Sequence, residues 1–409
     1  MSMISASSAV AAGPSVRGRL GGNPLALGVA LALLALGAWY LDAAFGARQA
    51  ALYLVGGALG ATLYHAAFGF TSSWRVFLAD GRGAGLRAQM AMLAIACALF
   101  FPALAAGSLF GAPVRGFVSP VGVSVVAGAF LFGIGMQLGG GCASGTLYTV
   151  GGGSTRMLVT LAAFVAGSLA GSAHLPWWSS LPHLAPVSLV ETLGGGLALA
   201  LNLAVFAAIA AATVWIERRR HGALRRDARR TGWLRGPWPL LTGAVLLAGL
   251  NFATLALAGR PWGVTSAFAL WGAKAAAALG VDVASWPYWQ AAANKAALAA
   301  PVAADVTSVM DFGVIVGALA AAGLAGRFAP TWRIPRKSLV AAIVGGILLG
   351  YGARLAFGCN IGAYFSGIAS GSLHGWLWLA AAFAGNAVGT RLRPAFGLEV
   401  ERTPRETAC

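Results

Sequence analysis

Two glycine-rich stretches of this sequence each hold one cysteine in similar surroundings. Cys142 lies in "GGGCASG" and Cys359 lies in "FGCNIGA". The flanking glycines at matching positions are Gly141 and Gly145 in the first stretch and Gly358 and Gly362 in the second. Glycine destabilises the interior of a helix, so each stretch predicts a helix break with a thiol at the break. A lone buried cysteine is usually a small inert side chain, but the repetition of the whole arrangement favours a functional role for both.

Each break is followed by a stretch that is too short to cross a membrane, residues 143–150 in one case and 360–369 in the other. We interpret both stretches as short helices that begin just after the cysteine, which places Cys142 and Cys359 at helix N-termini. The free backbone N–H groups and the positive end of the helix dipole favour an anion there. Two such positions that face each other would form a pathway for a small anion, with one sulfur at each station.

Other polar residues near these stretches are candidates for the same pathway. Arg354 lies inside an apolar segment at the position that matches Gln137. A charge within a membrane is a functional hypothesis by default, with snorkelling to the interface as the alternative. Asn360 follows Cys359 directly and can either donate a hydrogen bond to an oxyanion or cap a helix. Hydroxyl groups at the mouths of the pathway, or at helix N-caps, are offered by Thr71, Ser72, Thr265 and Ser266.

Four further polar residues allow two interpretations. Arg156 and His374 align with each other when the two cysteine stretches are superposed, and they either contact an anion or mark the membrane interface. Asp305 and Asp311 lie near the start of an apolar segment. For these two we expect an interfacial position rather than a role in proton coupling.

The composition requires most of the chain to avoid water. Charged residues make up 10% of the 409 residues and hydrophobic residues make up 58%, whereas a soluble protein carries about 25% charged residues. Ten apolar segments have lengths close to the roughly 20 residues that a helix needs to cross a bilayer. They lie near 25–41, 49–68, 86–107, 118–138, 155–175, 189–216, 237–258, 306–326, 338–357 and 373–391. The sequence therefore predicts an all-α polytopic membrane protein.

The net charge of +17 is concentrated in short loops between the apolar segments. The loop 217–236 alone holds eight arginines, and an excess of Lys and Arg in short loops places them in the cytoplasm. Counting crossings from the basic N-terminal segment then places both termini in the cytoplasm. A run of arginines is also typical of a nucleic-acid patch, but its place between membrane segments argues against nucleic acid as a partner.

The residue types that hold metals and cofactors are not grouped in this sequence. The four cysteines, Cys97, Cys142, Cys359 and Cys409, have no CxxC spacing and no histidine close enough to complete a zinc site. We expect Cys97 to be structural and Cys409 to have no role. The sequence contains no GxxxxGK[ST] phosphate-binding loop, so we expect no cofactor and passive or secondary transport.

Three blocks of sequence recur in the same order in the two halves of the chain. They are "FGFTSSW" (68–74) with "WGVTSAF" (262–268), "GMQLGGGCASG" (135–145) with "GARLAFGCNIG" (352–362), and "LAAFVAGSLAG" (161–171) with "LAAAFAGNAVG" (379–389). The segments that lead into the first block cross the membrane in opposite directions in the two halves. We therefore expect an inverted repeat of two four-segment halves with short broken or re-entrant helices, an architecture that recurs in transporters.

This repeat divides the chain into five parts. They are an N-terminal tail with the first transmembrane helix (1–48), repeat 1 (49–175), a linker helix with the basic cytoplasmic loop (176–236), repeat 2 (237–391) and a cytoplasmic tail (392–409).

On the motifs "GGGCASG", "GARLAFGCNIGAYFSGI", "SLHGW" and "GFTSSWR", the chain resembles the YeeE/YedE family of sulfur-compound transporters over about residues 49–391. The resemblance implies an hourglass-shaped inverted repeat in the bacterial inner membrane that imports thiosulfate. It also implies that Cys142 and Cys359 relay the anion through S–H···S contacts, and that a cytosolic TusA-like sulfur carrier or a rhodanese receives the sulfur. Members often carry a further cysteine where this chain has Gly69, whose counterpart in the second half is Gly263. One relay position is therefore missing, which leaves another sulfur or selenium species open.

We accordingly expect a transporter rather than an enzyme: an inner-membrane importer of a small sulfur-containing anion, thiosulfate first, embedded in membrane lipid. A membrane thiol oxidoreductase or sulfurtransferase is the alternative, with Cys142 and Cys359 as its redox pair. It would need the two Cα atoms about 4.4–6.8 Å apart and an electron carrier, for which no motif is present. A transporter of organic or metal substrates is a further alternative, although a cation pathway usually contains acidic residues within its spans and this chain has almost none.

Overall fold

The computed structural model of the protein describes residues 22–224 and 232–400. Within these residues the chain is almost entirely helical, as expected, and the strands are limited to four short segments. β1 (Ser108–Leu109) pairs with β2 (Ala112–Pro113), and β3 (Val121–Gly122) pairs with β4 (His183–Leu184), both antiparallel. Residues 1–21, 225–231 and 401–409 lie outside the described residues. They belong to the predicted N-terminal tail, basic loop and C-terminal tail, and they include Cys409.

The helices of the first half lead from the N-terminal span to the basic loop. They are α1 (Pro24–Phe45), α2 (Ala47–Ala66), α3 (Phe70–Asp80), α4 (Ala84–Ala106), α5 (Val123–Gly139), α6 (Ala143–Gly151), α7 (Thr155–Ser179), α8 (Leu189–Leu193) and α9 (Gly195–His221). The helices of the second half are α10 (Leu240–Ala258), α11 (Thr265–Ala278), α12 (Pro287–Gln290), α13 (Ala292–Ala299), α14 (Val306–Ala325), α15 (Arg336–Leu355), α16 (Gly367–Ala369) and α17 (Leu373–Leu392). Three short 3-10 segments are η1 (Val283–Ser285), η2 (Val302–Ala304) and η4 (Arg393–Phe396), and η3 (Asn360–Ser366) is a π-helix.

Nine helical stretches of the described residues are long and apolar enough to cross a membrane. They are Pro24–Phe45, Ala47–Asp80, Ala84–Ala106, Val123–Gly151, Thr155–Ser179, Gly195–His221, Leu240–Ala258, Val306–Ala325 and Arg336–Leu355. Two of these stretches are broken helices, since Ala47–Asp80 holds α2 and α3, and Val123–Gly151 holds α5 and α6. The tenth expected segment, 373–391, forms α17 but is not among the nine, which we attribute to polar residues such as His374 and Asn386 within it. The protein is thus a multi-pass membrane protein.

Helices α5 and α15 pack against each other in opposite directions. A Cβ atom on Gly128 would lie 2.7 Å from the carbonyl oxygen of Gly352, and one on Gly135 would lie 2.8 Å from the carbonyl oxygen of Gly345. The residue numbers rise along α5 while they fall along α15, so the two helices are antiparallel. Each of them ends just before one of the two cysteines.

The contacts around this helix pair are reciprocal. A Cβ atom on Gly133 of α5 would overlap the carbonyl oxygen of Ala382 in α17, and one on Gly350 of α15 would overlap the carbonyl oxygen of Phe164 in α7. In the same way, α2 packs along α14 and α10 packs along both α2 and α4. These matched contacts and the antiparallel α5 and α15 support the inverted repeat, which remains a prediction, as does the division into five parts.

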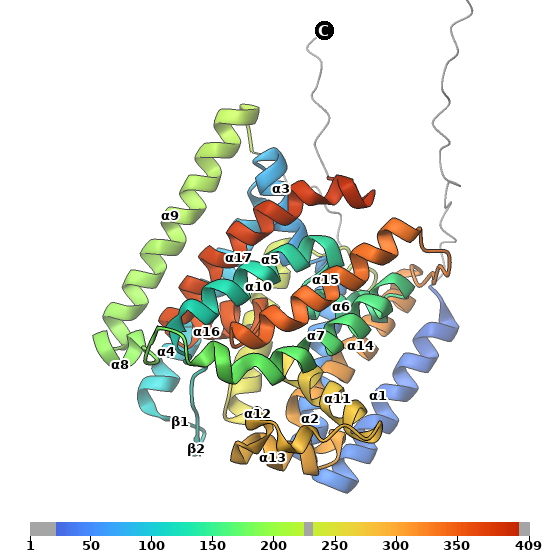
Figure 1. Cartoon of the computed structure of the whole chain (residues 1–409). Helices are drawn as coiled ribbons and strands as arrows, with labels where there is room; N and C mark the ends of the chain where they lie inside the picture. The colour runs from blue at the N-terminus through green and yellow to red at the C-terminus, as the bar shows by residue number, and fades with distance from the viewer. Residues whose placement is uncertain (1–21, 225–231, 401–409) are drawn as a thin grey trace, which may run out of the picture.

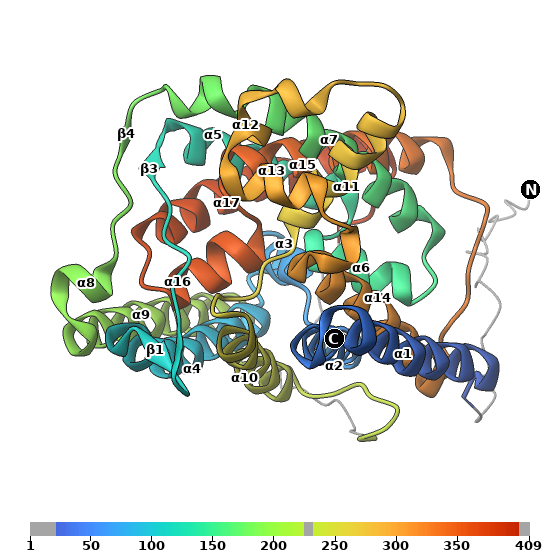
Figure 2. The same ribbon diagram turned by 90° about the horizontal axis from the view of Figure 1, so that it is seen from below.

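The described helices span the molecule from one end to the other (Figure 1). The β1–β2 hairpin, α12 and α13 lie at the lower end of the view and α8 lies at its left edge below α9, whereas α3 and the C-terminal end of α9 lie at the upper end. These two ends correspond to the loops that the charge pattern assigns to the outside and to the cytoplasm. Seen from below, α3 and α6 lie near the centre of the outline, with α1 and α9 toward its edges (Figure 2).

Candidate functional site

A break in the backbone separates each cysteine from the helix before it. After α5, Gly140 adopts a φ of +93°, and after α15, Phe357 and Gly358 have φ values of +54° and +151°. Glycine reaches such conformations without the steric cost that a side chain would add. The glycine-rich sequence therefore ends each long helix and lets the chain start a new, short one after the cysteine.

Cys142 is the N-cap of the nine-residue helix α6. Its Sγ accepts a hydrogen bond from the backbone N–H of Gly145 at 3.4 Å and lies 3.5 Å from the hydroxyl of Ser144. The cysteine is 2% exposed. The predicted position of Cys142 at a helix N-terminus agrees with this geometry.

Cys359 is the N-cap of η3 and is fully buried. Its Sγ accepts a hydrogen bond from the backbone N–H of Ile361 at 3.4 Å. The segment after Cys359 is π-helical rather than α-helical and continues into α16, a difference from α6 that the sequence did not predict. Tyr364 fixes this segment, because its ring stacks on Trp378 with the centroids 6.3 Å apart and its hydroxyl donates to Gln89 at 3.4 Å.

The two capped helices lie next to each other. Helix α6 contacts η3, so the two short segments meet in the interior of the fold. Asp311 lies in α14, the helix that packs along α6. We refer to Cys142, Cys359, Asn360 and Asp311 together as the cysteine site.

Asn360 brings an unused amide group to the cysteine site. The residue is fully buried, and neither its Oδ1 nor its Nδ2 has a hydrogen-bond partner among the described residues. A buried amide without partners is costly, so a position of this kind is suited to a ligand that accepts or donates a hydrogen bond. The sequence predicted Asn360 as a candidate donor.

The predicted hydroxyl groups have different surroundings. Thr71 is 4% exposed and its Oγ1 has no partner among the described residues, whereas Ser72 donates locally to the carbonyl of Gly69. In the second half, Thr265 is buried and the hydroxyl of Ser266 bonds to Thr307. The proposal that these hydroxyls serve as N-caps is wrong. The N-cap residues of α3 and α11 are Gly69 and Val264, and neither makes a side-chain cap bond.

Gln137 connects three helices, and both atoms of its amide group already have hydrogen-bond partners there. Its amide nitrogen donates to the carbonyl of Thr71 at 3.1 Å and to Asn386 of α17, while its amide oxygen accepts from Arg75 at 3.2 Å. Its backbone carbonyl accepts from Arg393. These bonds tie α3 and α17 to the last turn of α5.

Arg354, at the matching position of α15, has a different partner. Its Nη1 donates to the hydroxyl of Tyr288 at 2.8 Å, and the guanidinium carbon lies 6.0 Å from the centroid of that ring. Tyr288 lies in α12, so Arg354 is directed toward the end of the molecule that holds α12 and α13. Arg156 instead donates to the carbonyls of Leu138 and Gly139 and satisfies the C-terminal end of α5.

Asp311 is the residue whose place the sequence misjudged. We expected it at the interface, but it is fully buried inside the helix packing of α14, and neither carboxyl oxygen has a partner among the described residues. Asp305 behaves differently, since it caps α14 and accepts from the N–H and the hydroxyl of Ser308. A carboxyl within an apolar segment is the one signal in the sequence that indicates a buried functional group at Asp311.

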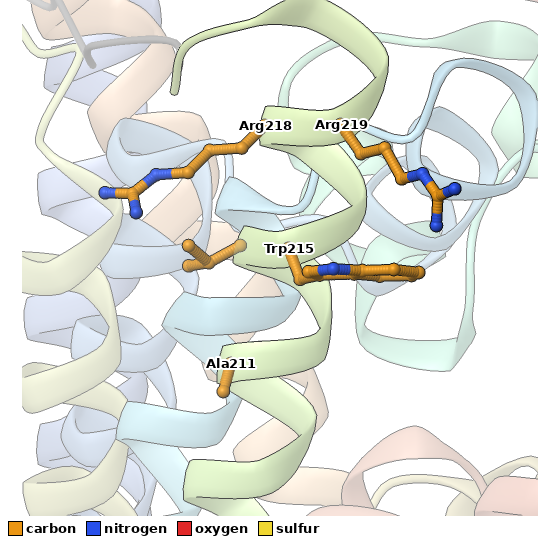
Figure 3. Close-up of a pocket in the computed structure, with 5 residues that line it drawn as sticks. Ala211, Trp215, Arg218 and Arg219 are labelled. Carbon is orange, nitrogen blue, oxygen red and sulfur yellow. The ribbon is translucent and has the colours of Figure 1, made fainter.

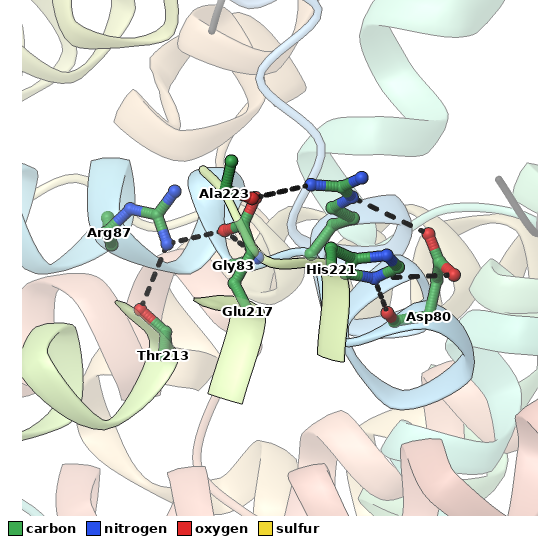
Figure 4. A network of polar contacts seen from close by, with 8 residues as sticks. Asp80, Gly83, Arg87, Thr213, Glu217, His221 and Ala223 are labelled. Carbon is green, nitrogen blue, oxygen red and sulfur yellow. Dashed lines mark hydrogen bonds and ion pairs between the residues drawn. The ribbon is translucent and has the colours of Figure 1, made fainter. Parts of the chain in front are cut away.

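A polar network at the other end of the molecule holds α9 in place (Figure 4). Glu217 is fully buried and accepts from Arg82 at 3.3 Å, from Arg87 at 2.8 Å and from the backbone N–H of Gly83. The loop between α3 and α4 is thereby joined to the last turns of α9. This network is remote from the cysteine site in the chain and uses none of its residues.

Comparison with known proteins connects this arrangement to a family. Residues 65–388 match the family described as "Sulphur transport". The "Probable transporter YedE" of Escherichia coli (strain K12) is 32% identical over 173 residues, which are 41% of this chain and 42% of that protein. The "Thiosulfate transporter TsuA" of Spirochaeta thermophila is 30% identical over 271 residues, which are 62% of this chain and 73% of TsuA. The aligned region thus spans less than half of YedE.

These matches confirm the resemblance that the cysteine motifs indicated. The matched region includes both cysteine breaks, all of α3 to α16 and most of α17. The chain belongs to the sulphur-transport family of membrane proteins that includes YedE and TsuA.

Proposed function

We propose that the protein imports a small sulfur-containing anion, thiosulfate in the first place, across the bacterial inner membrane, with both termini in the cytoplasm. The observation that carries the proposal is the pair of buried cysteines, Cys142 and Cys359, each capping a short helix at a break where the two short helices meet. The relative TsuA is a thiosulfate transporter by name, which points to the same anion.

The chemistry of the cysteine site suits an anion that must lose its hydration. Moving a divalent anion into an apolar interior is very costly unless polar groups replace the lost water. The backbone N–H groups at the start of α6 and the unused amide of Asn360 offer such groups. None of them carries a positive charge, so the anion is held weakly enough to be released again, as conduction requires.

The two thiols then act as stations along the path. Each Sγ accepts a backbone N–H from its own short helix, and the S–H of each can donate to an incoming sulfur or oxygen atom, that of Cys142 in exchange for its contact with the Ser144 hydroxyl. In this proposal the anion moves from one thiol to the other by exchange of weak hydrogen bonds, without a covalent step. Thr71, whose hydroxyl has no partner among the described residues, offers a further donor at the break between α2 and α3.

We also propose that a cytosolic sulfur carrier, TusA-like or a rhodanese, docks at the basic end of α9. Arg218, Arg219, Arg220 and His221 form its last turn. Figure 3 shows Arg218 and Arg219 on opposite sides of the helix, and the guanidinium of Arg219 lies 5.1 Å from the ring centroid of Trp215. Charged surfaces of this kind steer an acidic partner in a salt-dependent manner. Binding of a purified carrier that is insensitive to Arg218→Ala with Arg219→Ala would argue against this docking site.

The transport proposal is tested by uptake of radiolabelled thiosulfate into proteoliposomes. We expect uptake by the wild type to fall at least tenfold in Cys142→Ser and in Cys359→Ser, because a serine hydroxyl is a shorter and harder donor than the thiol. Cys97→Ser is the matched control, since Cys97 is equally buried but lies in α4, outside both glycine-rich stretches, and its Sγ donates to the carbonyl of Ile368 in α16. Competition by sulfite, sulfate and selenite then defines the class of anion.

Each outcome of this assay has a separate meaning. Absence of uptake by the wild type overturns thiosulfate as the substrate. Uptake that survives both cysteine substitutions retains the transporter and removes the thiol relay. Equal loss in all three variants, including Cys97→Ser, points to a general effect on folding.

A further inference from the structure

Asp311 is a buried carboxyl that the proposed relay does not use. It lies in α14, is fully buried, and has no hydrogen-bond or ion-pair partner for either oxygen among the described residues. A carboxylate in such surroundings costs far more than the neutral acid. The group is therefore expected to hold a proton while the protein rests.

The packing of α14 against α6 directs Asp311 toward Cys142. A Cβ atom on Gly151, at the end of α6, would meet Ala318 of α14 at 2.9 Å, and one on Gly153 would meet Phe328, just beyond the end of α14, at 3.1 Å. The two helices therefore run in the same direction. Asp311 precedes Ala318 by two helical turns on the same face, so it faces the beginning of α6, where Cys142 lies.

Helix α6 in turn contacts η3, the segment that Cys359 caps. Asp311 thus lies on the helix that packs along α6, although it comes from neither broken helix.

The other ionisable groups near α14 do not form hydrogen bonds with Asp311, and several of them bond to other residues. The ionisable and charged residues on α14 and on the elements packed against it are Asp305 of α14, Arg48, Tyr53, Tyr64 and His65 of α2, Tyr148 of α6, Lys274 of α11 with Arg260 before it, Tyr40 and Asp42 of α1, and the two cysteines. Asp305 bonds to Ser308, Arg260 donates to Thr307, and Lys274 donates to backbone carbonyls. None of these bonds reaches a carboxyl oxygen of Asp311.

In the first half of the chain, the position in α4 that corresponds to Asp311 in α14 holds a side chain that does not ionise, Gln89. Gln89 is the sixth residue of α4, as Asp311 is the sixth residue of α14. The amide oxygen of Gln89 accepts from Trp74 at 2.9 Å and from Tyr364 at 3.4 Å. An amide neither gains nor loses a proton, so only the second half places an ionisable group beside the cysteine site at this position.

We propose that Asp311 binds the proton that crosses the membrane together with the anion. The inference rests on the proposed function. At rest Asp311 carries a proton that it took from the outer side, and the neutral acid tolerates a divalent anion at the two thiols. When the anion leaves toward the cytoplasm, Asp311 releases its proton to the same side, so one proton and one anion move inward per cycle. A carboxylate that kept its charge would repel the anion at this position.

The test uses proteoliposomes that contain a pH-sensitive dye, with the membrane potential held at zero by potassium and valinomycin. Addition of thiosulfate outside is expected to acidify the interior in step with uptake of the label. An interior that is one pH unit more alkaline is expected to drive about tenfold accumulation, since one proton per anion is worth a factor of ten per pH unit. In Asp311→Asn the pH gradient is expected to drive no accumulation, and acidification is lost.

Asp305→Asn is the matched control, because it removes a carboxyl from the same helix at a position where asparagine is an equally good N-cap. It should keep the accumulation of the wild type. If Asp311→Asn does not assemble, reaction of the wild type with a hydrophobic carbodiimide replaces it, and the label is expected on Asp311 together with loss of proton movement.

Three results would overturn the inference while leaving transport in place. They are thiosulfate uptake by the wild type without acidification, accumulation that follows a sodium gradient instead of the pH gradient, and undiminished proton coupling in Asp311→Asn or after labelling of Asp311. Absence of any thiosulfate uptake by the wild type would instead overturn the proposed function and this inference with it.

Discussion

Asn360 and Asn251 are two buried asparagines with opposite surroundings. The amide of Asn251 is fully used, since its nitrogen donates to Ser366 at 3.2 Å and its oxygen accepts from the N–H of Trp262 at 2.9 Å. The amide of Asn360 has no hydrogen-bond partner among residues 22–224 and 232–400. At the scale of the residue, this contrast separates a side chain that stabilises the fold from one that is held ready for a ligand.

Replacement of these two residues by alanine is expected to have opposite effects. Asn360→Ala should raise the KM for thiosulfate about tenfold, because a hydrogen bond to a charged group contributes about 1.5–3 kcal/mol, and it should leave the thermal midpoint unchanged or higher. Asn251→Ala should lower the midpoint and leave KM unchanged. Uptake kinetics and thermal unfolding of the purified protein measure both. An Asn360→Ala variant that unfolds earlier with an unaltered KM would assign the amide to the fold instead.

At the scale of the helix, glycine allows the two halves to approach backbone to backbone. Gly133 of α5 lies against the carbonyl oxygen of Ala382, and Gly350 of α15 lies against that of Phe164. Small residues at helix contacts are typical of membrane proteins, where close packing rather than the hydrophobic effect holds helices together. The same two helices end at the cysteines, so this packing also sets where the thiols lie.

A methyl group at either contact is expected to push the helices apart. Gly133→Ala and Gly350→Ala should each destabilise the protein by about 1–3 kcal/mol, the usual cost of overpacking, and should lower thiosulfate uptake because the cysteine site shifts. Gly249→Ala in α10 is the control, since a Cβ atom there meets no other atom within 4 Å. Thermal unfolding compares the three variants. Equal midpoints for all of them would contradict the role of these contacts.

The helix breaks were predictable from the sequence because their signal is local. Glycines on both sides of Cys142 and Cys359 end one helix, and a short apolar stretch begins the next. The position of Asp311 was not predictable, because it depends on how α14 packs along α6 and not on the residues around Asp311. The π-helical form of η3 and the bonds of Gln137 to α3 and α17 also depend on tertiary contacts.

At the scale of the whole molecule, the last turns of α9 are attached to the loop between α3 and α4 by the buried carboxylate of Glu217, beside a contact of His221 with Asp80. Glu217 joins it to Arg82, Gly83 and Arg87 (Figure 4), while most of the helix is exposed along its length. Removal of one partner from a buried ion pair is expensive because the other charges lose their compensation.

Glu217→Gln is therefore expected to loosen α9 without altering the cysteine site. We expect a lower thermal midpoint and faster proteolysis near residues 218–224, with the KM for thiosulfate unchanged. Glu191→Gln in the exposed part of α8 is the control and should stay within about 0.5 kcal/mol of the wild type. A change of KM in Glu217→Gln that is as large as in the cysteine variants would show that this end of the molecule takes part in anion passage.

The difference between α6 and η3 has a consequence for transport measured from the two sides. A nine-residue α-helix follows Cys142, whereas a π-helix follows Cys359, so the two breaks present their sulfur atoms and N–H groups in different geometries. The equilibrium distribution of the anion depends only on the gradients across the membrane, but the half-saturating concentration need not be the same for entry from the outside and from the inside. Inward and outward uptake in vesicles of known orientation should therefore saturate at unequal concentrations, which would give the two directions of transport different apparent affinities.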